Sequence, residues 1–292
     1  MFNQPSSDTA YIAQPRRRWT LSTMSGLTAS GFGMSQVGSG EGVEAQLLTE
    51  PHFAQSISLG YRGFSISLPI LKLNHSNDRE FSLASFGNRL GVEVSLRRNT
   101  SMSGNLTLLP SRLWSEIPQG ATNELAFDLD VYYAFNHTRF SFPAAYNHTY
   151  IQRRSAGSPF LSMSLRLGKM NINPDGEVPD MGSIRLHTNL LCLGGGYGHS
   201  FVLRQGWVLH GSLLTSIAVV PIKRLFIDGE RVRIGFRFPD FVNTLNLSAV
   251  RNTDRWFGGF SIRVHSTIYG NAKNTRFIGI RGQAQLTLGL RF

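Results

Sequence analysis

The chain has 292 residues, of which 41% are hydrophobic and 16% charged, so it can build a sizeable core and is not a charged, disordered chain. Its single cysteine, Cys192, excludes an intramolecular disulfide framework and the usual cysteine-based zinc sites. The net charge of +11 suggests anionic partners, but the arginines are scattered singly along apolar segments, a pattern that does not favour nucleic acid as a partner.

Residues 1–18 carry a basic cluster and no recognisable signal peptide. Arg16, Arg17 and Arg18 precede Trp19; they form either a solvated turn before a strand or an anchor at an anionic membrane surface. A basic start followed by an apolar stretch is missing. We expect that a leader peptide has been removed, that residues 1–18 form an N-terminal periplasmic segment, and that residues 19–292 form one β-domain.

Alternation of apolar and polar residues, which is typical of β-strands, runs through the rest of the chain. The alternating segments are, in chain order, 19–33, 41–49, 56–61, 64–71, 90–97, 124–135, 159–168, 185–198, 206–220, 241–250, 260–265 and 278–292. The last is the clearest, since every second residue from Ile278 is apolar or small. Segments 72–87, 110–123 and 136–158 are ambiguous. The pattern predicts an all-β chain with about twelve strands, and about ten to fourteen can be defended.

Many long antiparallel strands must protect their edges, and closure into a barrel does so completely. No apolar run is long enough for a transmembrane helix, whereas a membrane strand needs only ~9–11 residues of alternating character. The strands are long, and their polar faces are rich in Gly, Ser, Thr, Gln and single arginines, with few Lys or Glu. We therefore predict a single closed antiparallel transmembrane β-barrel.

The C-terminal strand ends on an aromatic residue, as the closing strand of outer-membrane barrels commonly does. Gln285, Leu290 and Phe292 occupy the polar, apolar and aromatic positions of that terminal pattern, although Thr287 stands where glycine is expected. We predict that these three residues form the signal read by the barrel-assembly machinery. This places the protein in the bacterial outer membrane, with outer-membrane lipid as its surroundings.

Charged residues on the polar faces are expected to point into the lumen, because an arginine facing lipid costs ~2–4 kcal/mol near mid-bilayer. The predicted lumen-lining residues are Glu93, Arg97, Asp128, Asp130, Arg263, His265, Arg281 and Arg291, the last near the periplasmic rim. In a twelve-strand barrel the acidic group at 93–130 and the basic group at 263–291 lie roughly on opposite walls. They either set a transverse field across an open pore or pair and close a narrow barrel.

Aromatic residues bracket one of the predicted strands. Trp256 and Phe257 stand at its start, and Tyr269 stands at its end. This spacing is typical of the aromatic girdle that membrane barrels carry at both interfaces.

A family resemblance rests on two stretches of the middle of the chain. Phe140–Tyr146 reads FSFPAAY and Gln152–Ser158 reads QRRSAGS. Together they resemble a signature of the bacterial family named domain of unknown function 4421, and Tyr11-Ile12 and Gly60–Pro69 are also similar to it. The resemblance covers nearly the whole chain. It implies an outer-membrane barrel of a Gram-negative bacterium and brings no activity and no catalytic residues.

The residue pattern gives little support to chemistry. The eight histidines are scattered and no two stand at i, i+2 on one strand beside a carboxylate, so neither a metal nor another cofactor is expected. A lipid-cleaving barrel would need Ser and His on one face, but His265 and Ser266 are adjacent and point to opposite faces. His210 with a serine of a neighbouring strand is the one remaining catalytic candidate. The glycine run Gly194–Gly198 lacks the residues of a phosphate loop and is interpreted as a strand bend or bulge.

These observations favour a non-enzymatic passive pore or small-solute channel with a polar, arginine-containing lumen, acting on small polar or anionic solutes. The alternative is a closed structural or partner-binding barrel that presents loops at 110–123, 169–183 and 221–240. A lipid-modifying enzyme and a soluble all-β binding protein are two further hypotheses.

Overall fold

The computed structural model of the chain describes residues 7–37, 42–62, 64–72, 78–109, 113–176, 178, 182–232, 240–271 and 275–292. Among these residues no helix has the length and apolar character needed to cross a membrane. The two helical segments are α1 (Phe142–Ala145) and the 3-10 turn η1 (Arg204–Gly206).

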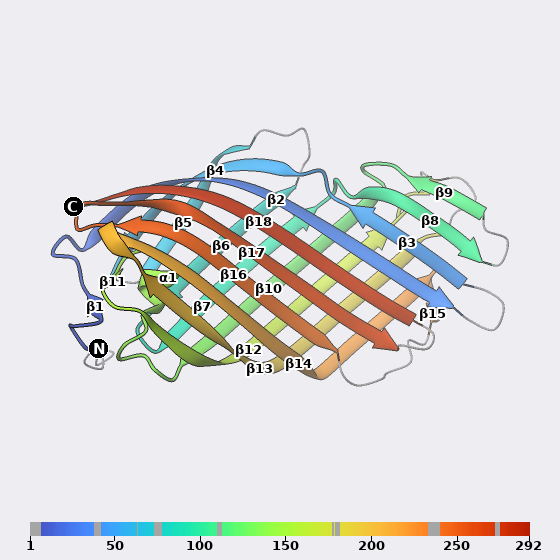
Figure 1. Cartoon of the computed structure of the whole chain (residues 1–292). Coiled ribbons are helices and arrows are strands. Elements are labelled where there is room, and N and C mark those ends of the chain that lie inside the picture. The colour runs from blue at the N-terminus through green and yellow to red at the C-terminus, as the bar shows by residue number, and fades with distance from the viewer. Residues whose placement is uncertain are drawn as a thin grey trace.

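Twelve long strands form a closed antiparallel barrel (Figure 1). These strands are β2 (Trp19–Val37), β4 (His52–Tyr61), β5 (Phe64–Lys72), β6 (Arg79–Phe86), β7 (Leu90–Asn99), β10 (Thr122–Ala134), β12 (Ala156–Ile172), β13 (Ile184–Val202), β14 (Trp207–Ile227), β16 (Phe241–Asn252), β17 (Trp256–Asn271) and β18 (Thr275–Arg291). Each pairs with the next, and β18 pairs with β2 from Thr275↔Gln36 to Arg291↔Thr20. This last pairing closes the ring, so the predicted all-β barrel of about twelve strands is confirmed.

Apolar residues cover the outside of the barrel and polar residues fill the inside. On β18, Leu286 and Leu288 are 52% and 56% exposed, whereas Thr287 between them is 7% exposed. On β12, Leu161 is exposed while Ser162 is buried. A soluble barrel would show the reverse arrangement, so this exterior is suited to lipid hydrocarbon. The molecule is therefore a transmembrane β-barrel, and the soluble all-β alternative does not fit it.

Both chain termini lie at one end of the barrel, which we call the terminus end, and the opposite end is called the far end (Figure 1). Four short strands add to the wall at the far end: β3 (Gly42–Leu48), β8 (Ser103–Leu109), β9 (Leu113–Ile117) and β15 (Glu230–Val232). β3 pairs with the far half of β2, and β8 and β9 follow in order, while β15 pairs with β14. The segment at 41–49, predicted as a strand, thus forms part of this extension rather than of the closed ring.

The three segments predicted as loops, 110–123, 169–183 and 221–240, are in part strands, which corrects that prediction. β9 lies within 110–123, β12 continues to Ile172, and β14 continues to Ile227 before the short β15. The alternation continues in these strand ends because their inward residues, such as Met170, Ile172 and Leu225, lie in one buried cluster with Leu106 and Ile117 of the extension. In addition, β15 pairs with the end of β14.

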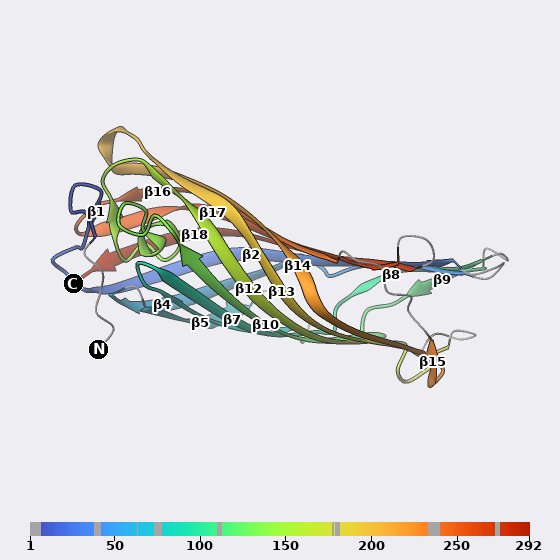
Figure 2. The same cartoon turned by 90° about the horizontal axis from the view of Figure 1, so that it is seen from below.

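An apolar cluster fills the inside of the far end. Leu106 and Ile117 of the extension are about 1% and 0% exposed and pack against residues of the opposite wall. The cluster consists of Met34, Ala45, Leu47, Met102, Leu106, Ile117, Ala121, Met170, Ile172, Val178, Ile184, Leu186, Leu225, Tyr269 and Phe277. Figure 2 shows the ribbons converging toward this end, where β8 and β9 lie between the two walls. We call these residues the far-end cluster.

The connection between β10 and β12, residues 135–155, folds into the terminus end of the barrel (Figures 1 and 2). It contains α1 and the two-residue strand β11 (Ile151–Gln152), which pairs with β1 (Ile12–Ala13) near the N-terminus. The helix begins at Ser141, whose hydroxyl accepts a hydrogen bond from the Ala144 amide at 3.2 Å. We call residues 135–155 the plug; they account for most of the segment 136–158, whose sequence pattern is ambiguous.

Aromatic packing holds the plug inside the barrel. Phe140 and Phe142 are 0% and 1% exposed, and the ring of Phe142 lies 5.1 Å from that of Phe160 and 6.2 Å from that of Phe86 on the wall. Ala156, Leu214 and Tyr132 of the wall complete this cluster. A loop on a membrane surface would not bury such rings, so the plug is an integral part of the lumen.

The aromatic girdle predicted around β17 is only partly present. Trp256 faces outward and is 38% exposed, but Phe257 and Tyr269 are 2% and 8% exposed and face inward. Phe257 lies beside His148 of the plug, and Tyr269 stacks on Phe277 in the far-end cluster. The prediction was wrong for these two residues because they lie on the same, inward face of β17 as Arg263. Phe257 packs at the terminus end of the lumen and Tyr269 packs at the far end.

Candidate functional site: the charged cavity of the lumen

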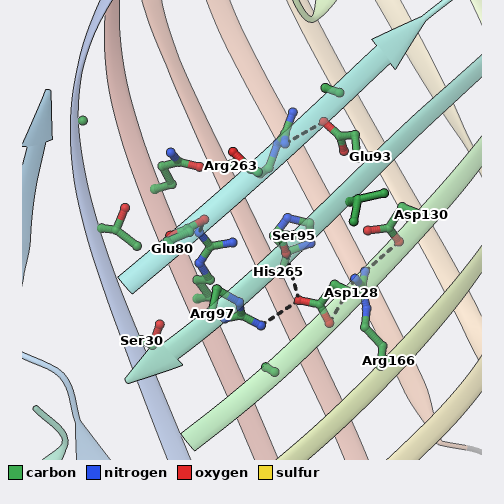
Figure 3. Close-up of a pocket in the computed structure, with 18 of the residues that line it drawn as sticks. Ser30, Glu80, Glu93, Ser95, Arg97, Asp128, Asp130, Arg166, Arg263 and His265 are labelled. Carbon is green, nitrogen blue, oxygen red and sulfur yellow. Dashed lines mark hydrogen bonds and ion pairs between the residues drawn. The ribbon is translucent and has the colours of Figure 1, made fainter. Parts of the chain in front are cut away.

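A cavity of about 370 Å³ lies in the lumen between the plug and the far-end cluster. Its lining is polar: serines and threonines of β2, β4, β5 and β6 on one side, and charged residues of β6, β7, β10, β12, β17 and β18 around it. Figure 3 shows the charged side chains converging from several strands. The inward parity of each strand positions them, since every second residue of a barrel strand faces the lumen.

Asp128 of β10 forms one centre of the charge network. Its carboxylate accepts hydrogen bonds from Arg97 at 2.7 Å and from Ser95 at 3.4 Å, both on β7. On the other side, Arg166 of β12 lies 3.3 Å from the same carboxylate. Two guanidinium groups on neighbouring strands therefore compensate this one carboxylate.

Arg166 also pairs with Asp130, two residues along β10, at 2.7 Å. Ser164, two residues before Arg166 on β12, donates a further hydrogen bond to Asp130. Arg166 thus bridges both aspartates along the lumen face of two paired strands. Charged groups removed from water need this degree of pairing to be tolerated.

Two ion pairs cross the lumen. Arg263 of β17 donates to Glu93 of β7 at 2.8 Å, and these strands stand on opposite sides of the ring (Figure 3). Arg281 of β18 likewise donates to Glu80 of β6. The acidic and basic walls predicted from the sequence therefore meet as contacts across the lumen rather than facing each other over open water.

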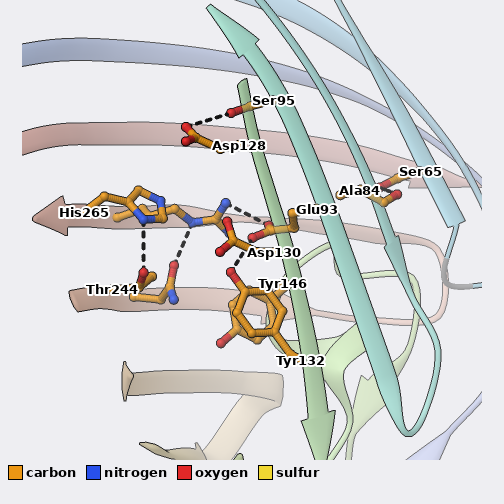
Figure 4. A network of polar contacts seen from close by, with 12 residues as sticks. Ser65, Ala84, Glu93, Ser95, Asp128, Asp130, Tyr132, Tyr146, Thr244 and His265 are labelled. Carbon is orange, nitrogen blue, oxygen red and sulfur yellow. Dashed lines mark hydrogen bonds and ion pairs between the residues drawn. The ribbon is translucent and has the colours of Figure 1, made fainter. Parts of the chain in front are cut away.

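The crossing pair is connected to the plug (Figure 4). Arg263 also donates to Asn246 at 2.7 Å, and its guanidinium lies 5.9 Å from the ring centre of Tyr146 on the plug. The Tyr146 hydroxyl is 2.9 Å from that of Ser212, which also accepts from Asn246 at 3.4 Å. The plug and the cross-lumen ion pair are thus parts of one network.

Arg291 lies below the cavity and fastens the plug to the wall. Its guanidinium donates to the main-chain carbonyl groups of His148 and Thr253 and, at 2.6 Å, to the Asn252 side chain. It also lies 4.8 Å from the ring centre of Phe257. Burial on the plug, together with the charge of Arg291, lowers the pKa of His148 to about 4, so this imidazole is neutral at pH 7.

The structure places seven of the eight predicted lumen residues around the cavity: Glu93, Arg97, Asp128, Asp130, Arg263, His265 and Arg281. His265 lies 3.0 Å from the Thr244 hydroxyl (Figure 4). Arg291 is the exception, at the plug. Two charged members of the network, Arg166 and Glu80, were not predicted from the sequence. The alternation of 159–168 puts Arg166 on one face with Ser162 and Ser164, so its signal was present, whereas Glu80 lies in the ambiguous segment 72–87.

The three residues of the predicted assembly signal separate between the two faces of β18. Gln285 faces the cavity, while Leu290 and Phe292 are 63% and 60% exposed on the outside. Phe292 exchanges main-chain hydrogen bonds with Trp19, at 3.1 and 3.2 Å, where the last strand meets the first.

The catalytic candidate His210 does have a serine beside it. Its Nδ1 lies 3.1 Å from the Ser200 hydroxyl of β13, and both side chains are buried on the inside of the wall. The rings of Phe140 and Tyr146 cover the imidazole at 5.8 and 5.3 Å. Within the described part of the chain, no side chain hydrogen-bonds to the other ring nitrogen, which is buried. The pair therefore packs against the plug and has no access to lipid.

No cluster of three or more His, Cys, Asp or Glu suited to a metal ion occurs among the residues the structure describes. Cys192 is buried in the wall beside Leu190 and Ala218. Paired carboxylates and guanidinium groups dominate the cavity, and such groups can hold charge and polar groups.

An apolar exterior, a charged lumen and an internal plug define the molecule as a plugged transmembrane β-barrel. The chain belongs to the family described as domain of unknown function (DUF4421), whose model matches residues 6–292. No curated protein matches the chain.

Several solved structures resemble the fold at low identity. The outer membrane protease OmpT from Escherichia coli is 8% identical, with 95% of this chain and 97% of that chain covered and a TM-score of 0.48. The β-domain of the Bordetella autotransporter BrkA is 11% identical, with 94% and 100% covered and a TM-score of 0.36. The translocator domain of the autotransporter NalP from Neisseria meningitidis is 9% identical, with 92% and 88% covered and a TM-score of 0.36. All three TM-scores lie below 0.5.

Proposed function

We propose that the protein is a bacterial outer-membrane barrel with a closed lumen, and that it is a structural or partner-binding barrel rather than an open pore or an enzyme. The observation that carries this proposal is the filling of the lumen at both ends. The plug packs the terminus end and the far-end cluster packs the other, with cross-lumen ion pairs between them.

The energetics of the plug support closure. Phe140 and Phe142 are buried, and Tyr146 is partly buried against them. Burying three aromatic side chains contributes roughly 5–9 kcal/mol of transfer free energy before the cost of ordering the segment. An open state would have to give up this burial and also leave His148 and Arg291 without their contacts.

The charge balance of the cavity supports the same proposal. Five carboxylates and four guanidinium groups line the cavity, and all but one are in ion pairs: Glu80, Glu93, Asp128 and Asp130 pair with Arg97, Arg166, Arg263 and Arg281. The fifth carboxylate, Glu124, accepts a hydrogen bond from the Asn99 side chain at 2.6 Å. Paired charges offer little field to a passing ion. The surface left for function is the extension at the far end. Within the described part of the chain, β9 and β15 each pair with a single strand there and so present an open edge.

Solute efflux from vesicles tests the proposal. Protein folded into lipid vesicles, and verified by heat-modifiable migration on a gel, is expected to leave a trapped sugar-sized solute inside. Rapid efflux through the unaltered protein would show that the lumen conducts and would overturn the closed-barrel proposal.

A gated channel for small polar or anionic solutes is the second candidate. It is favoured by one observation: a cavity remains in the lumen, and the plug is a connection between β10 and β12 rather than part of the wall. Replacing residues 137–150 by a Gly-Ser linker of equal length separates the two candidates. The closed barrel predicts that the far-end cluster still blocks efflux, whereas the channel predicts efflux, and Arg281→Glu in the same background then shifts selectivity toward cations.

A further inference from the structure

A cluster of cations faces outward near the far end of the wall. Lys169 of β12 is paired with His187 of β13, and His187 is paired with Arg224 of β14, so the three stand on one rung of three adjacent strands. Arg185 lies two residues from His187 on the same face. Their chain neighbours Met170, Leu186 and Leu225 are buried in the far-end cluster, so these four side chains point away from the lumen. We call these four residues the outer cationic cluster.

No carboxylate among the described residues forms an ion pair with the cluster. The ion pairs found within the described part of the chain use none of its four members, although they use four arginines of the cavity. Lys169 and Arg224 stand on either side of His187, on strands ~5 Å from its own, and Arg185 lies on the same face. Three like charges are thus held close together, which is destabilising. An external anion would relieve this repulsion, because it would lie between the cations in the place a carboxylate takes elsewhere.

The cluster lies at the edge of the apolar exterior. Leu167 on β12, Leu193 on β13 and Ile222 on β14 are 37%, 47% and 46% exposed on the same faces, toward the terminus end. On β14, Trp207 starts the strand and Arg224 follows it 17 residues later. At ~3.3 Å per residue and ~45° tilt this spans about 40 Å along the barrel axis. That span matches the ~40–45 Å of a bilayer with its headgroups, so Arg224 stands at headgroup height on the far side.

We propose that the outer cationic cluster binds the phosphate groups of a membrane lipid in the far leaflet. Arginine binds phosphate oxygens in a fork geometry and lysine adds a point charge. The acyl chains of such a lipid lie on the apolar residues directly beside the cations. A lipid headgroup satisfies both surfaces at once, whereas free phosphate satisfies only the charged one. The far leaflet is taken as the outer leaflet. This rests on the outer-membrane location proposed above and on the expected periplasmic position of residues 1–18 at the terminus end.

Binding of a phosphorylated glycolipid to the purified full-length barrel tests the proposal. The probes are lipid A with its phosphates, lipid A after phosphate removal, and inorganic phosphate, each measured by native mass spectrometry in detergent. The variant Lys169→Gln/Arg185→Gln/Arg224→Gln removes three charges from the cluster. Arg16→Gln/Arg17→Gln/Arg18→Gln is the matched control, because it removes three exposed charges at the terminus end. Heat-modifiable migration of both variants verifies folding.

Phosphorylated lipid A is expected to bind the unaltered protein and the control, and to bind the cluster variant roughly tenfold or more weakly, since each basic residue near a lipid surface contributes to attraction. Dephosphorylated lipid A and inorganic phosphate are expected to bind weakly to all three proteins. Equal loss in both variants, or equal binding of the dephosphorylated lipid, would overturn the inference. Cell fractionation is independent of this result: a protein missing from the outer-membrane fraction would overturn the proposed location alone.

Discussion

The direction of a single side chain decides which surroundings it meets in this barrel. Asp128 and Asp130 point inward and find Arg97 and Arg166, whereas Leu125 and Leu161 point outward and are half-exposed to lipid. Parity along a strand is visible in a sequence, and so the lumen residues on the clearest strands could be predicted from it. The partners of each residue could not, because they lie on strands far away in the chain.

The cross-lumen pair gives the first prediction. Removing one partner of a buried ion pair leaves an uncompensated charge, so Arg263→Met is expected to lower the free energy of unfolding by about 3–5 kcal/mol. The double variant Arg263→Met/Glu93→Leu is expected to recover most of that loss. Urea unfolding in lipid vesicles measures both. Additive losses in the double variant would show that the two residues are not coupled.

The exposure of β18 to lipid leads to a second prediction. Its control is a second position on the same face of the strand, nearer the edge of the bilayer. Leu286 and Leu290 are both exposed on β18, but Leu290 lies next to the end of the strand at Arg291. Leu286→Arg is expected to cost ~2–4 kcal/mol, while Leu290→Arg is expected to cost ~0–1 kcal/mol. The same unfolding experiment tests this, and equal costs at both positions would contradict a lipid-facing β18.

At the scale of elements, the plug is the part that the sequence pattern could not reveal. Segment 136–158 has neither strand nor helix periodicity, and its position depends on contacts such as those of Phe142 with Phe86 and Phe160. Its family signature, FSFPAAY, coincides with the residues that enter the lumen. For segment 41–49 the prediction was wrong in a different way. Its alternation correctly predicts a strand, but it does not show that this strand pairs with β8 in an extension outside the closed ring.

The plug carries a third prediction, on pH. The pKa of His148 is about 4 in the fold and ~6.5 in an unfolded chain. Because its pKa is lowered by folding, the unfolded state binds more protons between these values, and stability falls as pH drops from about 6.5 toward 4. At pH 5 this one group is expected to cost about 2 kcal/mol relative to pH 7. His148→Gln should lack that component.

The temperature of the heat-modifiable gel shift, measured at pH 7 and pH 5, checks this prediction. On acidification from pH 7 to pH 5, the temperature of the gel shift should fall further for the unaltered protein than for His148→Gln. An identical loss in both proteins would mean that His148 is not held neutral by the plug.

For the whole molecule, the proposed closure of the lumen rests on three sets of contacts that lie one after another along the barrel axis. The plug, the charge network and the far-end cluster each bring opposite walls into contact. The sequence predicts the ring and its two faces because these depend on local alternation. Whether the lumen is open depends on packing between walls, such as that of the far-end cluster, which contains Leu106 of β8 and Leu225 of β14, and alternation does not encode it.

Single-channel recording of the refolded, unaltered protein in a planar bilayer tests closure most directly. The gel shift on heating verifies that the inserted protein is folded. A closed lumen predicts a silent membrane at moderate voltage, because the plug and the far-end cluster pack its two ends. Discrete, reproducible conductance steps would contradict it and would show that the lumen is an open pore.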